Sequence, residues 1–180
     1  MTRRTLVVAS LLLAAVAAPF ACPRTAHALE IIPAVGVSGG STGGVAQYVA
    51  LDVRLPVVPS IDVDAGTAFR SRDYASDVKA RQWTVTGSLL WHPLPNLYAG
   101  AGVGSYTTDF TQPIDTAYDS NQTKFATHLT AGYRMPIVPK LATLDLNGRY
   151  VFLGKRVPSA TDGSLKADFW LVSAGVSIGF

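Results

Sequence analysis

The stretch Val45-Ala46-Gln47-Tyr48-Val49-Ala50-Leu51-Asp52-Val53-Arg54-Leu55 decides the fold class. Every second residue from Val45 to Leu55 is apolar except Gln47, whereas the residues between them are small, aromatic or charged. Side chains alternate between two faces with this period in a β-strand. The stretch therefore predicts a strand with one apolar face and one face that carries Tyr48, Asp52 and Arg54.

The same period of two continues along the chain, without a convincing stretch at the 3.6-residue period of a helix. Short breaks bracketed by proline alternate with longer polar breaks, and proline both ends strands and presets turns. The short breaks lie at 55–59, 92–96 and 135–140, and the long ones at 39–44, 71–81, 111–124 and 153–167. They separate eight predicted strands, at 31–38, 45–55, 61–70, 82–92, 97–109, 125–135, 141–152 and 168–180.

The charged residues indicate which face of these strands points outward. In a soluble lipocalin-type barrel, the apolar face would fill the interior and long charged side chains would cover the outside. Here all five lysines fall in the predicted breaks, and the polar faces carry Asp and Arg among small and hydroxyl residues. Such side chains suit the narrow interior of an eight-stranded barrel. We therefore expect an all-β protein, a closed eight-stranded antiparallel up-and-down transmembrane β-barrel, with tight turns at one rim and loops at the other.

Bulky aromatic residues gather on the apolar face near the ends of the predicted strands. This sorting is typical of two belts at the membrane interfaces, whereas a soluble core would not sort aromatics to the strand ends. The expected lipid-interface aromatics are Phe69, Trp83, Trp91, Phe125, Tyr133, Tyr150, Trp170 and Phe180.

The polar face predicts a network of charges inside the barrel. A first hairpin centred near residue 58 would place Arg54 opposite Asp62 and Asp52 opposite Asp64. The expected lumen network is Asp52, Arg54, Asp62, Asp64, Arg70, His128, Arg134, Asp145 and Arg149. Such a network is either an ion path or a plug of paired charges, and the narrow lumen favours the plug. His92, beside the turn at Pro93, is expected at the water interface, and the spacing of the histidines predicts neither a metal site nor a cofactor.

The amino terminus has the layout of a secretory signal peptide. Arg3 and Arg4 precede the apolar run 6–18, and the small-x-small triplet 26–28 follows. We expect cleavage after Ala28, which leaves a barrel domain at 29–180. Loss of Arg3, Arg4 and Arg24 lowers the number of Lys and Arg residues from 15 to 12, which equals the number of Asp and Glu residues. The mature chain then has no net charge, so its charge gives no reason to expect a nucleic-acid partner. The single cysteine, Cys22, leaves with the signal peptide, so no disulfide is expected.

Two motifs carry a family resemblance. The chain ends in Val176-Ser177-Ile178-Gly179-Phe180, and residues 94–106 read Leu-Pro-Asn-Leu-Tyr-Ala-Gly-Ala-Gly-Val-Gly-Ser-Tyr. The first is similar to a terminal aromatic assembly signal, and the second to a proline turn followed by a glycine-alternating fifth strand. Both resemble the small eight-stranded outer-membrane barrels of Gram-negative bacteria, including the OmpA-like, OmpX-like and outer membrane protein W-like groups.

The resemblance implies the location and the partners of the chain. It implies an outer-membrane protein with its tight turns toward the periplasm and its loops outward. The implied partners are outer-membrane lipid and lipopolysaccharide, and the barrel-assembly machinery through Phe180. We expect a monomer.

Fold alone does not fix function, so three hypotheses remain. The first is a non-enzymatic barrel with an envelope-structural or surface-interaction role, whose outer loops present Asp115, Tyr118, Asp119 and Asn121. The second is passage of small apolar molecules, as the outer membrane protein W-like resemblance suggests, and it would use inward-facing Phe169 and Leu171.

The third hypothesis is a lipid A acyl hydrolase built on His128, Thr130 and Asp145. Against it, Thr replaces the serine of the hydrolase pattern, and all three residues are expected to face the lumen rather than the lipid. A plain interior histidine is therefore the favoured interpretation of His128.

Overall fold

The computed structural model describes residues 29–40, 44–74, 78–111, 121–138, 141–156, 165–166 and 168–179. Its strands are β1 (Glu30–Gly40), β2 (Ala46–Val58), β3 (Ile61–Tyr74), β4 (Val78–Leu94), β5 (Leu97–Thr111), β6 (Asn121–Val138), β7 (Ala142–Phe152), β8 (Lys155–Arg156), β9 (Leu165–Lys166) and β10 (Phe169–Gly179). The predicted signal peptide, the loop residues Asp115, Tyr118 and Asp119, and Phe180 lie outside the described residues.

No α-helix within the described ranges is long and apolar enough to span a membrane.

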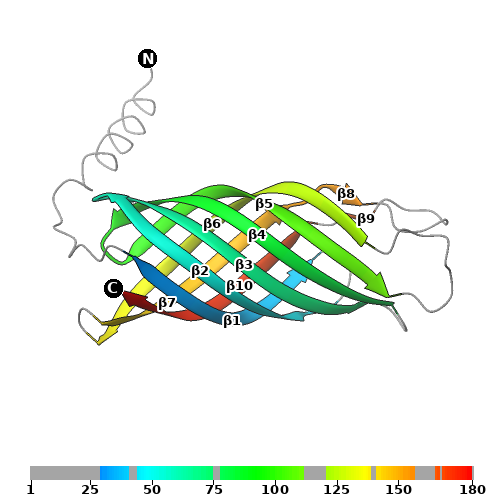
Figure 1. Cartoon of the computed structure of the whole chain (residues 1–180), viewed down its shortest axis with the longest axis horizontal. Helices are drawn as coiled ribbons and strands as arrows, with labels where there is room; N and C mark the ends of the chain where they lie inside the picture. The colour runs from blue at the N-terminus through cyan, green and yellow to red at the C-terminus, as the bar shows by residue number, and fades with distance from the viewer. Residues whose placement is uncertain are drawn as a thin grey trace, which may run out of the picture.

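Eight strands close into one barrel in the order β1-β10-β7-β6-β5-β4-β3-β2 (Figure 1). Every neighbouring pair is antiparallel, and β1 pairs with β10 from Glu30↔Gly179 to Gly40↔Phe169, which leaves the barrel without a lateral edge strand. The tight turns β2–β3, β4–β5 and β6–β7 lie at one end, here called the turn end, and the strand ends that the other connections join lie at the opposite end, here called the loop end. The predicted fold class is confirmed.

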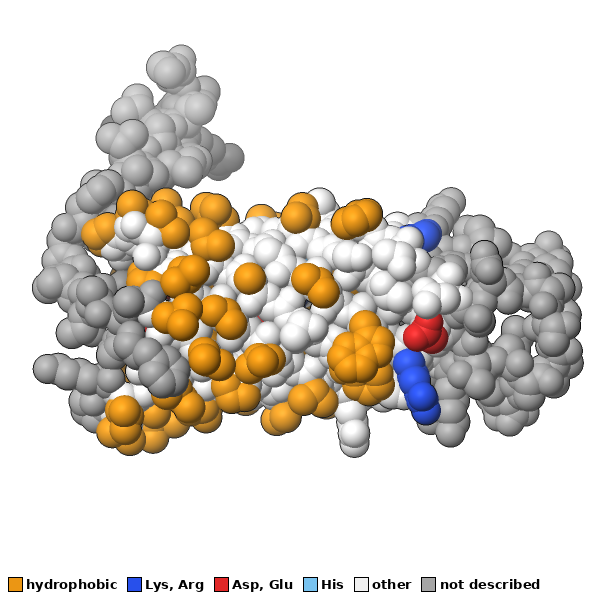
Figure 2. Space-filling model, in the orientation of Figure 1, with side chains coloured by type: hydrophobic (Ala, Val, Ile, Leu, Met, Phe, Trp, Pro, Cys, Tyr) orange, Lys and Arg blue, Asp and Glu red, His pale blue; other side chains and the backbone are white. Residues whose placement is uncertain are grey.

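Burial in this barrel is inverted relative to a soluble protein. The apolar register of each strand is exposed, with Phe125 84% and Val85 65% accessible, whereas Asp62, Arg54 and His128 are at most 3% accessible. Hydrophobic side chains accordingly cover much of the outer wall in Figure 2, and charged side chains appear beside the loop end. An apolar outer wall suits contact with lipid. The closed barrel also suits lipid, because it satisfies its backbone hydrogen bonds internally. The predicted outward direction of the apolar face is confirmed.

The strands are longer than predicted because the first proline of each short break lies inside a strand. The ladders shift register between Pro56 and Val58, between Trp91 and Leu94, and between Pro136 and Val138. Proline cannot donate a ladder hydrogen bond, so a bulge at the strand end accommodates it.

The strands also extend further at the loop end than the sequence predicted. The prediction that every lysine lies in a break was wrong, since Lys79 and Lys124 lie in β4 and β6, and Lys155 and Lys166 lie in the short strands β8 and β9. Asn121, predicted to lie in an outer loop, is the first residue of β6 and pairs with Asp109.

The loop end is uneven in height. The ladder between β5 and β6 runs out to Asn121, but the described pairing of β6 with β7 stops at Thr127↔Phe152. On the other side, β3 pairs with β4 to Tyr74, but with β2 only to Ser71. Strands β3, β4, β5 and β6 therefore continue past the last described pairings with β2 and with β7 as a projecting sheet, and in Figure 1 the green strands β4 and β5 reach past β1.

A bulge separates the small hairpin β8–β9 from the β7–β10 ladder that it continues. The β7–β10 ladder ends at Val151↔Phe169 and the β8–β9 ladder has the pair Lys155↔Lys166, so the β7 side advances by four residues where the β10 side advances by three. Gly154 adopts a φ of +74°, and its N–H donates to Asp168 Oδ1 at 2.9 Å. Glycine in the left-handed region is typical of such a bulge, which increases the local twist.

Candidate functional site: the closed lumen

Residues of one parity on each strand point into the lumen, and the charged ones concentrate in the half near the turn end. Glu30 on β1, Arg54 on β2 and Asp64 on β3 are each at most 9% accessible. Asp145 and Arg149 on β7 are also buried, and Arg134 on β6 is half-buried. The fold thus gathers charges from strands far apart in sequence into one enclosed volume.

These charges form a continuous chain of ion pairs. At the turn end, Arg134 Nη2 donates to Glu30 Oε2 at 2.6 Å, and Arg134 Nε lies 3.9 Å from Asp145 Oδ2. Arg54 Nη1 donates to Asp145 Oδ2 at 2.8 Å, and Arg54 Nε to Asp64 Oδ2 at 3.4 Å. Arg149 Nη2 lies 4.0 Å from Asp64 Oδ1. The chain alternates in sign along its length, as buried charges require.

The predicted register of the first hairpin was wrong by two residues. Arg54 pairs with Asp64 rather than with Asp62, and Asp52 pairs with Gly66 rather than with Asp64. The turn is Pro59-Ser60 and the register shifts at Pro56, so the hairpin is not centred near residue 58. A bulge adds one residue to one strand, and no alternation pattern reveals which strand carries it.

Asp62 forms a second ionic contact, at the base of the lumen. Its Oδ2 lies 2.7 Å from His92 Nε2, and both side chains are buried. The expectation that His92 marks the water interface was wrong, because His92 continues the inward register of Leu90 on β4.

Polar residues that the sequence analysis did not single out complete the network. Tyr98 OH donates to Asp145 Oδ1 at 2.6 Å and accepts from Asn147 Nδ2 at 2.8 Å. The Arg54 guanidinium carbon lies 4.7 Å from the centroid of the Tyr98 ring, a cation–π distance. Asn147 shares the inward parity of Asp145 and Arg149 on β7, so parity would have identified it, whereas β5, which carries Tyr98, holds no predicted network member.

The half of the lumen near the loop end is different in character. Arg70 Nε donates to Gln82 Oε1 at 2.7 Å, and its guanidinium carbon lies 3.5 Å from the centroid of the Phe169 ring. Around it lies a buried, largely apolar cluster that includes Tyr106, Ala126, Val151, Leu153, Phe169 and Leu171. The lumen therefore has an ionic layer toward the turn end and a largely apolar layer toward the loop end.

The residues of the hydrolase hypothesis are not assembled into a catalytic arrangement. His128 Nε2 lies 2.9 Å from Ser88 Oγ, and Thr130 Oγ1 instead donates to the carbonyl of Gly148 and accepts from Asn147. Asp145 is bonded to Arg54 and Tyr98. All three side chains are at most 4% accessible and face the lumen, away from lipid. No cluster of three metal-ligating side chains occurs among the described residues.

The predicted aromatic residues lie on the outer face. Phe69 and Trp83 stand opposite each other in the ladder with ring centroids 4.8 Å apart, and Trp170 stands opposite Tyr150. With Phe125, these residues lie toward the loop end, whereas Trp91 and Tyr133 lie toward the turn end. The position of Phe180 falls outside the described residues.

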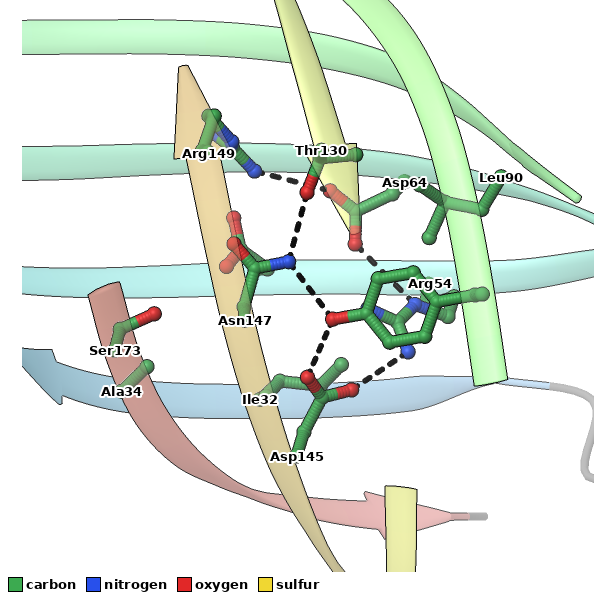
Figure 3. A pocket seen from close by; sticks show the side chains of 12 residues that line it. Ile32, Ala34, Arg54, Asp64, Leu90, Thr130, Asp145, Asn147, Arg149 and Ser173 are labelled. Atoms are coloured by element: carbon green, nitrogen blue, oxygen red, sulfur yellow. Dashed lines mark hydrogen bonds and ion pairs between the residues drawn. The ribbon is translucent and has the colours of Figure 1, made fainter. Parts of the chain in front are cut away.

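The enclosed side chains leave little free space. A cavity bounded by Asp52, Arg54, Asp64, Tyr98, Asp145 and Arg149, among others, leaves about 10 Å³ for the centre of a water-sized sphere (Figure 3). A second cavity, under Phe169 and Leu171, has the same volume. Each has about the smallest volume that holds one water molecule.

Comparison with known proteins identifies the fold. No family model matches the sequence, and no curated protein matches it significantly. Among solved structures, Neisserial surface protein A aligns with a TM-score of 0.64 at 16% identity, over 84% of this chain and 96% of that one. The attachment invasion locus protein Ail of Yersinia pestis, in complex with the heparin analogue sucrose octasulfate, aligns with a TM-score of 0.51 at 16% identity, over 83% and 96%.

A third solved structure supports the same conclusion. The N-terminal β-barrel domain of Pseudomonas aeruginosa OprF aligns with a TM-score of 0.50 at 12% identity, over 86% of this chain and 98% of that one. At these identities the likeness establishes the fold alone. The fold is that of the small eight-stranded outer-membrane barrels, as the sequence resemblance implied.

Proposed function

We propose that this protein is a non-enzymatic integral outer-membrane barrel, closed by its own side chains, that acts through its projecting outer sheet. The apolar outer wall and the closed ladder support insertion into the outer membrane, with the turn end toward the periplasm. Outer-membrane lipid and lipopolysaccharide would surround the wall, Phe180 would engage the assembly machinery, and the barrel would act as a monomer.

The observation that carries this proposal is the packing of the lumen. Neither of the two cavities described above, each of about 10 Å³, is large enough to hold a column of water. The buried chain from Glu30 to Arg149 fills the ionic layer, and the cluster around Phe169 fills the layer above it. A barrel filled in this way serves as a rigid support for the projecting sheet of β3, β4, β5 and β6 at the loop end.

At the loop end the projecting sheet is the most distinctive surface. Residues 121–126 of β6 pair with β5 but not with any other described strand. A strand that pairs on one side within its sheet can accept an extended segment as an additional strand along its other side. The exposed ring of Phe125 lies on this edge and offers an apolar contact.

The test combines localisation with conductance. We expect the protein in the outer-membrane fraction, with a heat-modifiable shift on gels, and no resolvable conductance steps in planar bilayers at neutral pH. Recovery from the soluble fraction would contradict the membrane proposal. Steady single-channel steps from purified protein would contradict the closed lumen.

A second candidate function is passage of small apolar molecules through the wall. The favouring observation is the apolar layer around Phe169 and Leu171, beside the place where the described β6–β7 pairing ends. The small cavity volumes mean that a ligand would have to displace side chains to enter. Faster uptake of a fluorescent apolar probe by vesicles that contain the protein, and loss of that uptake in Leu171→Arg, would favour passage over the closed support.

A further inference from the structure

Two polar groups that border one lumen cavity have no partner among the described residues. Arg149 is 7% accessible, and its Nε is buried without a hydrogen-bond partner. Its other nitrogens are engaged, because Nη1 donates to Thr86 Oγ1 at 3.2 Å and Nη2 lies 4.0 Å from Asp64. The carboxylate of Asp52 makes no hydrogen bond or ion pair to any described residue, in contrast to Asp64 and Asp145.

Asp52 and Arg149 both border the cavity shown in Figure 3, which leaves about 10 Å³ for the centre of a water-sized sphere. The Asp52 side chain lies over Gly66, since a Cβ at Gly66 would collide with Asp52 Oδ1. Asn147, Thr130 and Ser173 line the same space. Ile32, Ala34 and Leu90 also line it, so the lining is part polar and part apolar, and the volume is of the smallest size that holds a single water molecule.

The chemistry of the lining restricts what can occupy this cavity. Arg149 Nε offers a donor and requires an acceptor, whereas Asp52 offers acceptors and requires a donor. A metal cation would meet the Arg149 guanidinium, and an anion would meet the carboxylates of Asp52, Asp64 and Asp145. A water molecule accepts from one group and donates to the other.

We propose that this cavity binds one ordered water molecule, which accepts from Arg149 Nε and donates to Asp52. Such a water removes the cost of an unsatisfied buried donor, which is about 1–3 kcal/mol for a single group. It also connects Asp52 to the ion-pair chain that begins at Glu30. The inference concerns the folded lumen itself and holds whether or not the outer sheet binds a partner.

The test uses nuclear magnetic resonance on the refolded protein in lipid nanodiscs, with labelled arginine side chains. We expect a nuclear Overhauser cross-peak from a long-lived water to the Arg149 Hε. Arg54 supplies an internal control, since its Nε already donates to Asp64 and should show no such cross-peak. Absence of a water signal at Arg149, or an equal signal at both arginines, would overturn the proposal.

Two variants extend the test. Asp52→Asn retains an acceptor and a similar volume, so the water signal at Arg149 should persist. Asp52→Leu removes the carboxylate and should abolish it, while the Arg54 resonance is retained as a sign of correct folding. A signal that persists in Asp52→Leu would contradict the assignment of Asp52 as the second partner. A crystal structure that places a protein oxygen directly on Arg149 Nε would overturn the site without any variant.

Discussion

Replacing Arg54 by methionine tests whether the lumen chain stabilises the barrel. The Arg54 side chain is 4% accessible and connects two carboxylates from different strands, Asp64 at 3.4 Å and Asp145 at 2.8 Å. Methionine keeps much of the length and volume of arginine but none of its charge. The substitution therefore leaves two buried carboxylates without their principal cation.

The expected cost follows from what remains around those carboxylates. Removing one partner of a buried pair costs about 3–5 kcal/mol. Asp145 keeps the Tyr98 hydroxyl at 2.6 Å and Arg134 Nε at 3.9 Å, and Asp64 keeps Arg149 Nη2 at 4.0 Å. These contacts reduce the loss, so we expect a destabilisation at the lower end, about 3 kcal/mol.

The assay is equilibrium unfolding by urea in lipid vesicles, followed by tryptophan fluorescence. Trp83, Trp91 and Trp170 all lie on the outer face, so their emission reports transfer between lipid and water. The matched control is Arg81→Met, because Arg81 lies on the exposed outer face of β4 and should change stability by less than about 0.5 kcal/mol.

A double-mutant cycle with Asp145→Asn separates the ion pair from general packing. If Arg54 and Asp145 stabilise the barrel as a pair, the double variant should lose less than the sum of the single losses, by about 1 kcal/mol or more. A loss below about 1 kcal/mol in Arg54→Met, together with additive single effects, would refute the reasoning.

Three further predictions concern the wall and the loop end. Leu89→Arg places a charge on the exposed face of β4 between Trp83 and Trp91, two residues from the midpoint at Gly87, and should destabilise the vesicle-bound barrel by about 2 kcal/mol in the same urea assay, whereas an unchanged midpoint of unfolding would argue against lipid contact there. Gly132→Val puts a side chain where a Cβ would collide with the Tyr98 ring, so the temperature of the heat-modifiable gel shift should fall, and a wild-type temperature would mean that Tyr98 can move away. Gly154→Ala forces a φ of +74° on alanine at a cost of about 1–2 kcal/mol, so trypsin should cleave faster at Lys155 and Arg156, and unchanged cleavage would contradict a strained bulge.

The direction of each side chain could be predicted from sequence, because period-two alternation is a local property of a strand. Val49 faces outward and Tyr48 inward, as their positions at 45–55 indicated. It was also predictable that the apolar face points outward and the polar face into the lumen, since Asp and Arg lie on the less apolar face of the predicted strands. The breaks correctly predicted the eight strands of the barrel, but not the short strands β8 and β9, which lie inside the break predicted at 153–167.

The partners across the lumen could not be predicted from sequence. Arg54 and Asp145 are 91 residues apart, and they meet because closure of the barrel staggers the strands by a fixed amount that no local pattern encodes. Register within the first hairpin failed for a related reason, because the bulge at Pro56 is invisible to alternation. Glu30 lies outside the predicted strands and the predicted lumen network, yet its Oε2 accepts from both Arg134 and Ser177.

The uneven loop end has a practical consequence for labelling the protein on living cells. At about 3.3 Å per residue and a tilt of roughly 40°, the six residues 121–126 raise the tip of β6 by about 15 Å over its last pairing with β7. In the outward orientation that we propose for the loop end, an epitope tag inserted between β5 and β6 would clear the lipid headgroups and be available to an antibody. The same tag between β1 and β2 would start from the low side of the rim, closer to the lipopolysaccharide that we propose surrounds the wall.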